Sequence, residues 1–265
     1  MKNTILSKLP TECPWRDTLY WYPCVDSTND LAKHMAKEGA AHGTVIIAGT
    51  QTGGRGRMGR SFQSPGGAGM YLSVILRPNC HAAELMHLTC AAGVAAVAAV
   101  ERAAGIRVGL KWINDLVFEN KKLGGILAEL SLDAKTGIVD YAIIGIGINC
   151  REPEGGFSPD IESIATSLAC AGHAVSPEEL AAETIRSLWE MSSHLLTEKA
   201  SIMAAYRKLC VTLGRQIMVI RGESRFPGKA VDMDDDGGLV ILLEDGCKET
   251  VSSGEVSVRG LWDYV

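Results

Sequence analysis

Apolar residues recur with a helical period in four parts of the chain. The first helix is predicted at residues 31–39, where Ser27 and Asp30 have capping-box spacing and Gly39 ends the segment. Residues 82–104 are apolar and rich in alanine, which predicts a buried helix. A third helix opens at the cap and first-turn proline Ser176-Pro177, and a fourth covers residues 199–209. The predicted apolar face of the third helix comprises Leu180, Ile185, Leu188, Trp189 and Leu196.

Runs of apolar and β-branched residues predict strands between these helices. Two are expected at residues 44–48 and 70–76, and four more follow in close order at residues 107–112, 116–119, 123–132 and 138–148. The connections between the last four are short and turn-rich, as antiparallel neighbours require. From Gly214 onward, alternation and turns describe about five short strands, a small barrel. The fold class is therefore α+β, a mixed, largely antiparallel sheet with packed helices, with domains at residues 1–212 and 213–265.

Composition excludes several classes of protein. The 26 basic and 31 acidic residues give a net charge of -5, which argues against nucleic-acid or anionic-membrane partners. The eight cysteines include no C-x-x-C pair and the N-terminus has no signal-peptide pattern, so we expect a reduced, cytoplasmic protein. The six histidines lack ligand spacing, which predicts no structural metal. The most apolar run, residues 85–100, is 16 residues long and short for a membrane span.

One loop stands out against this acidic background. Residues 53–60 contain four glycines and three arginines, a combination suited to holding an anion. The loop partly matches both the dinucleotide-binding and the P-loop sequence motifs, but no helix follows it, as both motifs require. The acidic residue of the dinucleotide motif and the lysine of the P-loop are also missing. The alternative to an anion-binding loop is a basic loop that is simply exposed to solvent. The acidic residues at positions 232–236 could bind a metal ion, but they fit a solvated hairpin turn better.

Six motifs in fixed order resemble those of biotin protein ligases. The resemblance runs from about Asp26 to the C-terminus, and it implies a class II synthetase-like catalytic domain followed by an SH3-like domain. Six ordered motifs are far more specific than any one of them. They are Ser27-Thr28-Asn29, Gln51 with residues 53–60, Lys111-Trp112-Ile113-Asn114-Asp115, Lys122-Leu123-Gly124-Gly125-Ile126-Leu127, Gly145-Ile146-Gly147-Ile148-Asn149 and Ala165-Thr166-Ser167-Leu168.

The resemblance implies a two-step reaction with biotin and ATP as substrates. The biotin carboxylate attacks the α-phosphate of ATP to give biotinyl-5'-AMP, and a lysine of a biotin carboxyl carrier protein then takes the biotin. Bringing a carboxylate to a triphosphate needs preorganised positive charge, which the loop arginines can supply. Mg²⁺ would accompany ATP, held chiefly by phosphates and waters.

The resemblance also assigns roles to individual positions. The implied catalytic residues are Lys122, Arg55 and Arg57. The implied biotin contacts are Ser27, Thr28, Asn29, Gln51, Gly54, Arg55, Lys122 and Gly125. The implied nucleotide contacts are Arg57, Arg60, Asn114, Lys122, Gly147 and Asn149, and Asp115 is a weak candidate for one Mg²⁺ ligand. Structural roles are the alternative: Ser27 could cap a helix, Lys122 could stand in an ordinary hairpin turn, and Lys111 and Trp112 could belong to the core.

Two departures from the family pattern bear on function. Ile113 stands where the family usually has proline, which should leave Asn114 and Asp115 in register. Only 26 residues precede Ser27, so we expect no helix-turn-helix domain and no operator binding. Three alternatives stay open: a lipoate protein ligase, a non-catalytic biotin or nucleotide sensor, and a P-loop-like kinase. The oligomeric state, for which a homodimer is one option, is also open.

Overall fold

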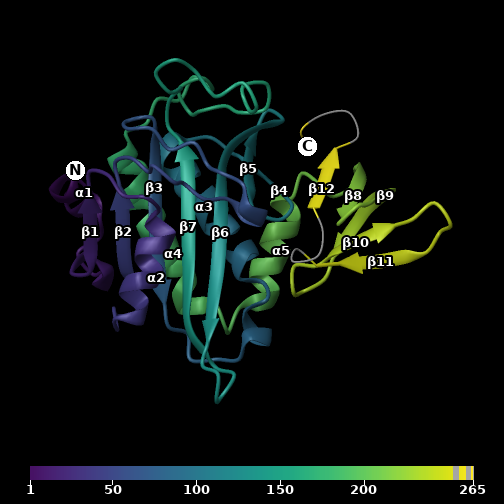
Figure 1. Ribbon diagram of the computed structural model, residues 1–265, viewed down its shortest axis with the longest axis horizontal. Helices are drawn as coiled ribbons and strands as arrows, with labels where there is room; N and C mark the ends of the chain where they lie inside the picture. The colour runs from purple at the N-terminus through teal and green to yellow at the C-terminus, as the bar shows by residue number, and fades with distance from the viewer. Residues whose placement is uncertain (253–256, 261–263, 265) are drawn as a thin grey trace.

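A seven-stranded sheet forms the centre of the computed structural model, which describes residues 1–252, 257–260 and 264 (Figure 1). The strand order is β1-β2-β3-β7-β6-β5-β4. Only β1 and β2 pair in parallel, so the mixed, largely antiparallel sheet is confirmed. The strands are β1 (Leu19–Tyr22), β2 (Thr44–Ala48), β3 (Gly69–Leu76), β4 (Gly109–Lys111), β5 (Asp115–Phe118), β6 (Lys121–Leu132) and β7 (Val139–Asn149).

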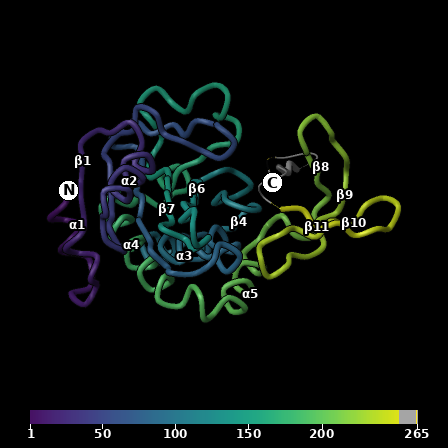
Figure 2. Tube along the Cα trace, turned by 60° about the horizontal axis from the view of Figure 1, so that its bottom comes forward, coloured from purple at the N-terminus to yellow at the C-terminus, as the bar shows by residue number. Residues whose placement is uncertain are grey.

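The helices cover the two faces of this sheet unequally. On one side α3 (Leu88–Ala104) packs between the sheet and the helices α4 (Pro177–His194) and α5 (Lys199–Leu209), as Figure 2 shows. Helix α2 (Thr28–Lys37) packs on β2, β3 and β7. Alternate strand residues separate the two layers, since Val45 belongs to the main core and Ile46 to a smaller cluster with α2. Much of the sheet face beside α2 is therefore left to loops.

Several predictions about the helices need correction. Helix α1 (Lys2–Lys8) precedes the helix predicted to be first, and α2 itself begins at Thr28 rather than residue 31. Ser27 does cap α2 by accepting from the Asp30 amide at 3.4 Å, but the Asp30 carboxylate pairs with Arg55 and Lys33 instead of completing a box. Leu196 lies beyond the end of α4 and is exposed, because the helix ends at His194.

The apolar segment predicted at residues 82–104 is a core element. It divides into a short 3-10 turn, Ala82–Leu85, and the helix α3. The segment is long and apolar enough to cross a membrane, yet 67% of its most apolar window is buried inside the protein. A core helix of a globular domain has this same composition, so the segment is weak evidence for a membrane span.

A second, five-stranded antiparallel sheet follows α5, in the order β11-β10-β9-β8-β12. Its strands are β8 (Gln216–Arg221), β9 (Ser224–Met233), β10 (Leu239–Leu242), β11 (Lys248–Val251) and β12 (Ser257–Gly260), which confirms the five predicted strands. Residues 253–256, 261–263 and 265 of the predicted C-terminal domain lie outside the described residues. The acidic run is a turn, as predicted, because Asp234 accepts from the amides of Asp236 and Gly238. Trp112 joins the two sheets by donating its indole N–H to the Gly237 carbonyl at 2.8 Å.

Candidate active site

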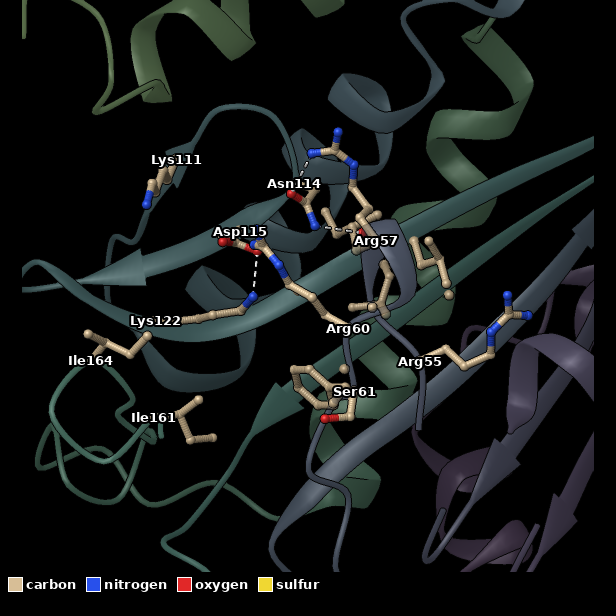
Figure 3. A pocket seen from close by; sticks show the side chains of 18 of the residues that line it. Arg55, Arg57, Arg60, Ser61, Lys111, Asn114, Asp115, Lys122, Ile161 and Ile164 are labelled. Carbon is tan, nitrogen blue, oxygen red and sulfur yellow. Dashed lines mark hydrogen bonds and ion pairs between the residues drawn. The ribbon is translucent and has the colours of Figure 1, made fainter. Parts of the chain in front are cut away.

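A cavity of about 890 Å³ opens beside α2, on the sheet face that α3 does not cover. This volume suits a ligand larger than a single small metabolite. Its walls come from the start of α2, the loop at residues 55–62, the turn between β4 and β5, the strands β6 and β7, residues 160–164 and Tyr264. Figure 3 shows the cavity from close by.

The hydrogen-bonding groups at the start of α2 that face the cavity are buried, polar and uncharged. Ser27, Thr28 and Asn29 are each at most 4% exposed. The amide and hydroxyl of Thr28 lie 2.8 and 3.0 Å from Gln51 Oε1, and Gln51 Nε2 donates to Ser64 Oγ at 2.9 Å. Neutral donors and acceptors held this way suit a neutral, polar ligand group.

The three loop arginines take different directions (Figure 3). Arg57 donates to Asn114 Oδ1 at 3.2 Å, and burial lowers its pKa despite the opposing effect of Asp115. Arg60 extends over the same part of the cavity (Figure 3). Arg55 lines the cavity wall but points away from this group, toward Asp30, to which it donates, and Glu129, whose Oε1 is 3.7 Å away. The loop therefore delivers two of its three guanidinium groups to one end of the cavity.

An ion pair between Lys122 and Asp115 lies at the centre of that end. Lys122 Nζ is 2.7 Å from Asp115 Oδ1, and the two side chains are 29% and 16% exposed. Asp115 begins β5 and Lys122 stands near the start of β6, its paired neighbour. The backbone of Lys122 is held on its other side, because its amide donates to the Ile164 carbonyl and its carbonyl accepts from the Thr166 amide at 2.9 Å. The lysine is thus fixed between two parts of the chain.

Tyr264 closes the cavity on the side of the second sheet. Its hydroxyl donates to Asp115 Oδ2, and its carbonyl accepts from Lys111 Nζ, which also lies 3.8 Å from the centre of the tyrosine ring. Burial, together with the Asp115 charge, raises the pKa of the Tyr264 hydroxyl, so it stays protonated and donates. Lys111 is buried, and a buried cation needs such partners.

Two glycines of the motifs are explained by close contacts. A Cβ on Gly147 would lie 2.5 Å from the Phe62 ring, and one on Gly124 would lie 2.5 Å from the Gly147 carbonyl oxygen. A Cβ on Gly125 would meet Lys122 Cε at 3.5 Å, an ordinary contact distance. Gly124 therefore allows strand packing and Gly147 leaves room for Phe62, whereas no close contact requires glycine at position 125.

Most of the residues predicted for the site lie together. Gly54 is outside the cavity wall, where a Cβ would lie 2.3 Å from the Phe62 carbonyl oxygen. Asn149 also lies outside it and donates to the Thr166 carbonyl at 2.9 Å. Ile113 is buried and leaves Asn114 and Asp115 on the wall, as expected. The predicted residues on the cavity wall are Ser27, Thr28, Asn29, Gln51, Arg55, Arg57, Arg60, Asn114, Asp115, Lys122, Gly125 and Gly147.

Sequence reasoning missed part of the wall. Phe62, Ile161, Ile164 and Tyr264 line the cavity without having been predicted to do so, and Lys111 had been weighed as structural. Two of them carried a signal in their positions: Phe62 lies two residues after the Arg-Gly loop, and Ile164 directly precedes the motif at residues 165–168. Within the described part of the chain no three His, Cys, Asp or Glu side chains gather as a metal site. Both Asp115 oxygens are engaged, by Lys122 and Tyr264, so a Mg²⁺ ion at Asp115 would have to displace one of these contacts.

Comparisons with known proteins find relatives over most of the chain. Residues 21–149 match the biotin/lipoate A/B protein ligase family, and residues 212–259 match the biotin protein ligase C-terminal domain. The structure of biotin protein ligase from Aquifex aeolicus in complex with biotin and ATP is 31% identical and covers 92% of this chain and 99% of that one, with a TM-score of 0.76. The bifunctional ligase/repressor BirA of Bacillus subtilis is 32% identical, over 89% of this chain and 72% of its own length. The biotin–(acetyl-CoA-carboxylase) ligase of Paracoccus denitrificans is 31% identical, over 89% of this chain and 98% of its own length.

Proposed function

The chain belongs to the biotin protein ligase family, and from this premise we propose how its residues divide the work of the reaction. Its activity is that of a biotin–protein ligase, with biotin and ATP as substrates. One observation supports the division of roles proposed here. The same cavity has a neutral hydrogen-bonding end at α2 and a cationic end at Lys122, which matches an uncharged ring that carries a carboxylate on a chain.

The neutral end would hold the biotin head. Ser27, Thr28, Asn29 and Gln51 supply hydroxyl and amide groups that the protein has already oriented and buried. A ureido group donates and accepts hydrogen bonds without charge, so it loses little on entering such a wall. The biotin carboxylate would then lie toward Lys122, beside Gly125, which lines the cavity.

The cationic end would hold the ATP phosphates. A carboxylate oxygen of biotin attacks the α-phosphorus, the new P–O bond forms, and the bond to the bridging oxygen breaks as pyrophosphate leaves. Negative charge builds on the phosphorus oxygens, and Lys122, Arg57 and Arg60 stand where they can stabilise it, each contributing about 3 kcal/mol if preorganised. Asn114 and Gly147 would border the nucleotide, and Asn149 would act by holding the Thr166 turn.

Arg55 enters this scheme only after a rearrangement. Its guanidinium group is paired with Asp30 and lies near Glu129, away from Lys122. A biotin carboxylate would have to draw it from these partners, which a glycine-rich loop permits. Gly54 would support the same loop through its contact with the Phe62 backbone.

The second step would take place at the same cavity. An uncharged carrier lysine attacks the carbonyl carbon of the adenylate, and the amide bond forms as the nitrogen loses a proton to solvent. The bond between that carbon and the phosphate oxygen breaks, and AMP leaves with the electron pair. We propose a biotin carboxyl carrier protein as this partner, supported by the acetyl-CoA-carboxylase in the Paracoccus relative's name. We further propose that Mg²⁺ arrives with ATP, that the protein works in the cytoplasm, and that its domains meet at residues 212 and 213. The position between the end of α5 and the start of β8 supports this boundary.

Exchange of labelled pyrophosphate into ATP tests the function directly. We expect exchange that depends on biotin and does not occur with lipoate. Exchange with lipoate alone would make the protein a lipoate ligase of the same superfamily. Binding of biotin and ATP without exchange with either acid would instead indicate a sensor that has lost its chemistry.

A further inference from the structure

The turn between β4 and β5 carries part of the cationic end of the cavity. Trp112, Asn114 and Asp115 line the cavity, whereas Ile113 between them does not and is 3% exposed. The Ile113 carbonyl accepts a hydrogen bond from the Tyr206 hydroxyl at 3.0 Å. Tyr206 belongs to α5 and is fully buried, so this bond ties the turn to the helices behind it.

Tyr206 reaches the turn from the side opposite the cavity. A Cβ on Gly93 of α3 would lie 3.4 Å from the Tyr206 ring, and α3 covers the sheet face that does not carry the cavity. The Tyr206 side chain does not line the cavity. The Ile113 carbonyl is therefore directed into the core.

The direction of this carbonyl also decides where the next amide points. The peptide bond between Ile113 and Asn114 is trans, and the N–H of a trans peptide points opposite to its carbonyl. Because the carbonyl is directed into the core, the Asn114 N–H is directed toward the cavity side of the turn. No acceptor for this N–H lies among residues 1–252, 257–260 and 264.

The other polar groups of Asn114 are already engaged. Its carbonyl accepts from the Ile126 amide at 2.8 Å, and its Nδ2 donates to the Ile126 carbonyl at 3.0 Å. Its Oδ1 accepts from Arg57 at 3.2 Å, on the wall that also carries the ion pair of Lys122 with Asp115 (Figure 3). A backbone N–H with no partner, placed among cations, suits a ligand with several anionic oxygens, which is the character of a phosphate.

We propose that Tyr206 is a positioning residue that orients the Asn114 N–H as a hydrogen-bond donor to a phosphate oxygen of the nucleotide. This inference rests on the function proposed above, which places the ATP phosphates at the cationic end. The Tyr206 hydroxyl acts through one peptide, because it holds the Ile113 carbonyl in the core while the N–H of the same peptide faces the ligand. Without the hydroxyl the buried carbonyl loses its partner, which is costly, and rotation of the peptide toward another donor turns the N–H away from the ligand.

Two tyrosine variants separate this role from a general effect on folding. Tyr206→Phe removes the hydroxyl and keeps the ring. Tyr71→Phe is the matched control, because Tyr71 is also buried and its hydroxyl also donates to a backbone carbonyl, that of Pro65, at 3.0 Å. Pro65 does not line the cavity. Both variants should lower the thermal midpoint to a similar extent, since each leaves one backbone carbonyl without its donor.

Only Tyr206→Phe should change the use of ATP. Pyrophosphate exchange measures the KM for ATP and the KM for biotin in one assay. We expect Tyr206→Phe to raise the KM for ATP about tenfold, the effect of losing one hydrogen bond to a charged acceptor, and to leave the KM for biotin within about twofold of wild type. Tyr71→Phe should leave the KM for ATP unchanged.

Selective labelling with ¹⁵N-asparagine observes the amide itself. The Asn114 signal is identified by its loss in Asn114→Ala. Addition of ATP with Mg²⁺ to the wild-type protein should move the Asn114 amide proton downfield, as a hydrogen bond to a phosphate oxygen does. At saturating ATP the same signal should move less in Tyr206→Phe, while Tyr71→Phe should behave like wild type.

Three results would overturn the proposal. These are an equal rise of both KM values in Tyr206→Phe, a matching rise of the KM for ATP in Tyr71→Phe, and an Asn114 signal that does not move at saturating ATP. Absence of biotin-dependent exchange in wild type would count against the proposed function instead, and a shift of the Asn114 signal with ATP would still support the role of Tyr206.

Discussion

Replacing Lys122 by alanine should separate catalysis from folding. The change removes Nζ from a contact of 2.7 Å with Asp115, in a place where both side chains are largely shielded from water. An exposed ion pair contributes about 0 to 1 kcal/mol to folding, and removing one partner of a fully buried pair costs about 3 to 5 kcal/mol. The Lys122–Asp115 pair is intermediate in exposure and Asp115 keeps the Tyr264 hydroxyl as a partner, so we expect a loss of about 1.5 kcal/mol.

The effect on chemistry should be larger than the effect on stability. Loss of one preorganised donor to the charge that develops on phosphorus costs about 3 kcal/mol, or roughly a 100-fold decrease in the rate of pyrophosphate exchange. Urea unfolding measures the first quantity and exchange kinetics the second. Lys135→Ala is the control, because Lys135 is an exposed lysine in the turn after β6, and it should change neither.

The combined variant Lys122→Ala/Asp115→Ala makes the test stricter. If the two side chains stabilise the fold chiefly through each other, the stability losses of the single variants should not add. The reasoning would be refuted by a folded Lys122→Ala protein whose exchange rate lies within about threefold of wild type. Lys122 would then be a strand residue whose ion pair serves structure alone.

Three further predictions concern other parts of the protein. Tyr264→Phe removes the donor to Asp115 but keeps the ring over Lys111, so the KM for ATP should rise a few-fold; exchange measured against ATP concentration checks this, and an unchanged KM would remove Tyr264 from the nucleotide site. Gly147→Ala should cost about 1 to 3 kcal/mol in urea unfolding, because the new Cβ meets the Phe62 ring at 2.5 Å; unchanged stability and exchange would show that Phe62 moves freely. Burial lowers the pKa of His87, so the unfolded chain takes up a proton at this histidine from about pH 6.5 downward while the folded protein does not. Thermal melting should therefore show wild type losing more stability than His87→Gln between about pH 7.5 and 5.5. Replacement of the exposed His34 by glutamine is the control.

Local patterns predicted the elements whose signals lie within one segment. The strand at residues 44–48 and the helix at residues 199–209 agree with the prediction to the residue, because alternation, period and breakers all fall inside them. The antiparallel order of β4 to β7 followed from short turns. Strand β1 was missed because it is four residues long and pairs in parallel with β2. Parallel strands are not joined by a tight turn, so no turn residues in the sequence indicate this pairing.

The site shows the same division between local and distant contacts. Motif residues on one loop or one strand end were predicted to meet, and most of them line the cavity. Tyr264 could not be predicted, because it bonds to a carboxylate 149 residues earlier in the chain and depends on how the second sheet returns to the first. The side-chain directions of Arg55 and Asn149 could not be predicted either, because each depends on a single partner. Arg55 donates to Asp30, and Asn149 donates to the Thr166 carbonyl.

The Arg-Gly loop joins two charge systems rather than one. Arg57 and Arg60 face the cationic end of the cavity, where the described wall also carries Lys111 and Lys122 around the carboxylate of Asp115. Arg55 joins Asp30, Lys33 and Glu129 on the other side. If a biotin carboxylate draws Arg55 toward Lys122, Asp30 and Glu129 lose a cation and Lys33 becomes their remaining partner. Movement of Arg55 toward biotin would therefore change the charge around Glu129, which also accepts a hydrogen bond from Asn29 Nδ2 on the cavity wall at 2.9 Å.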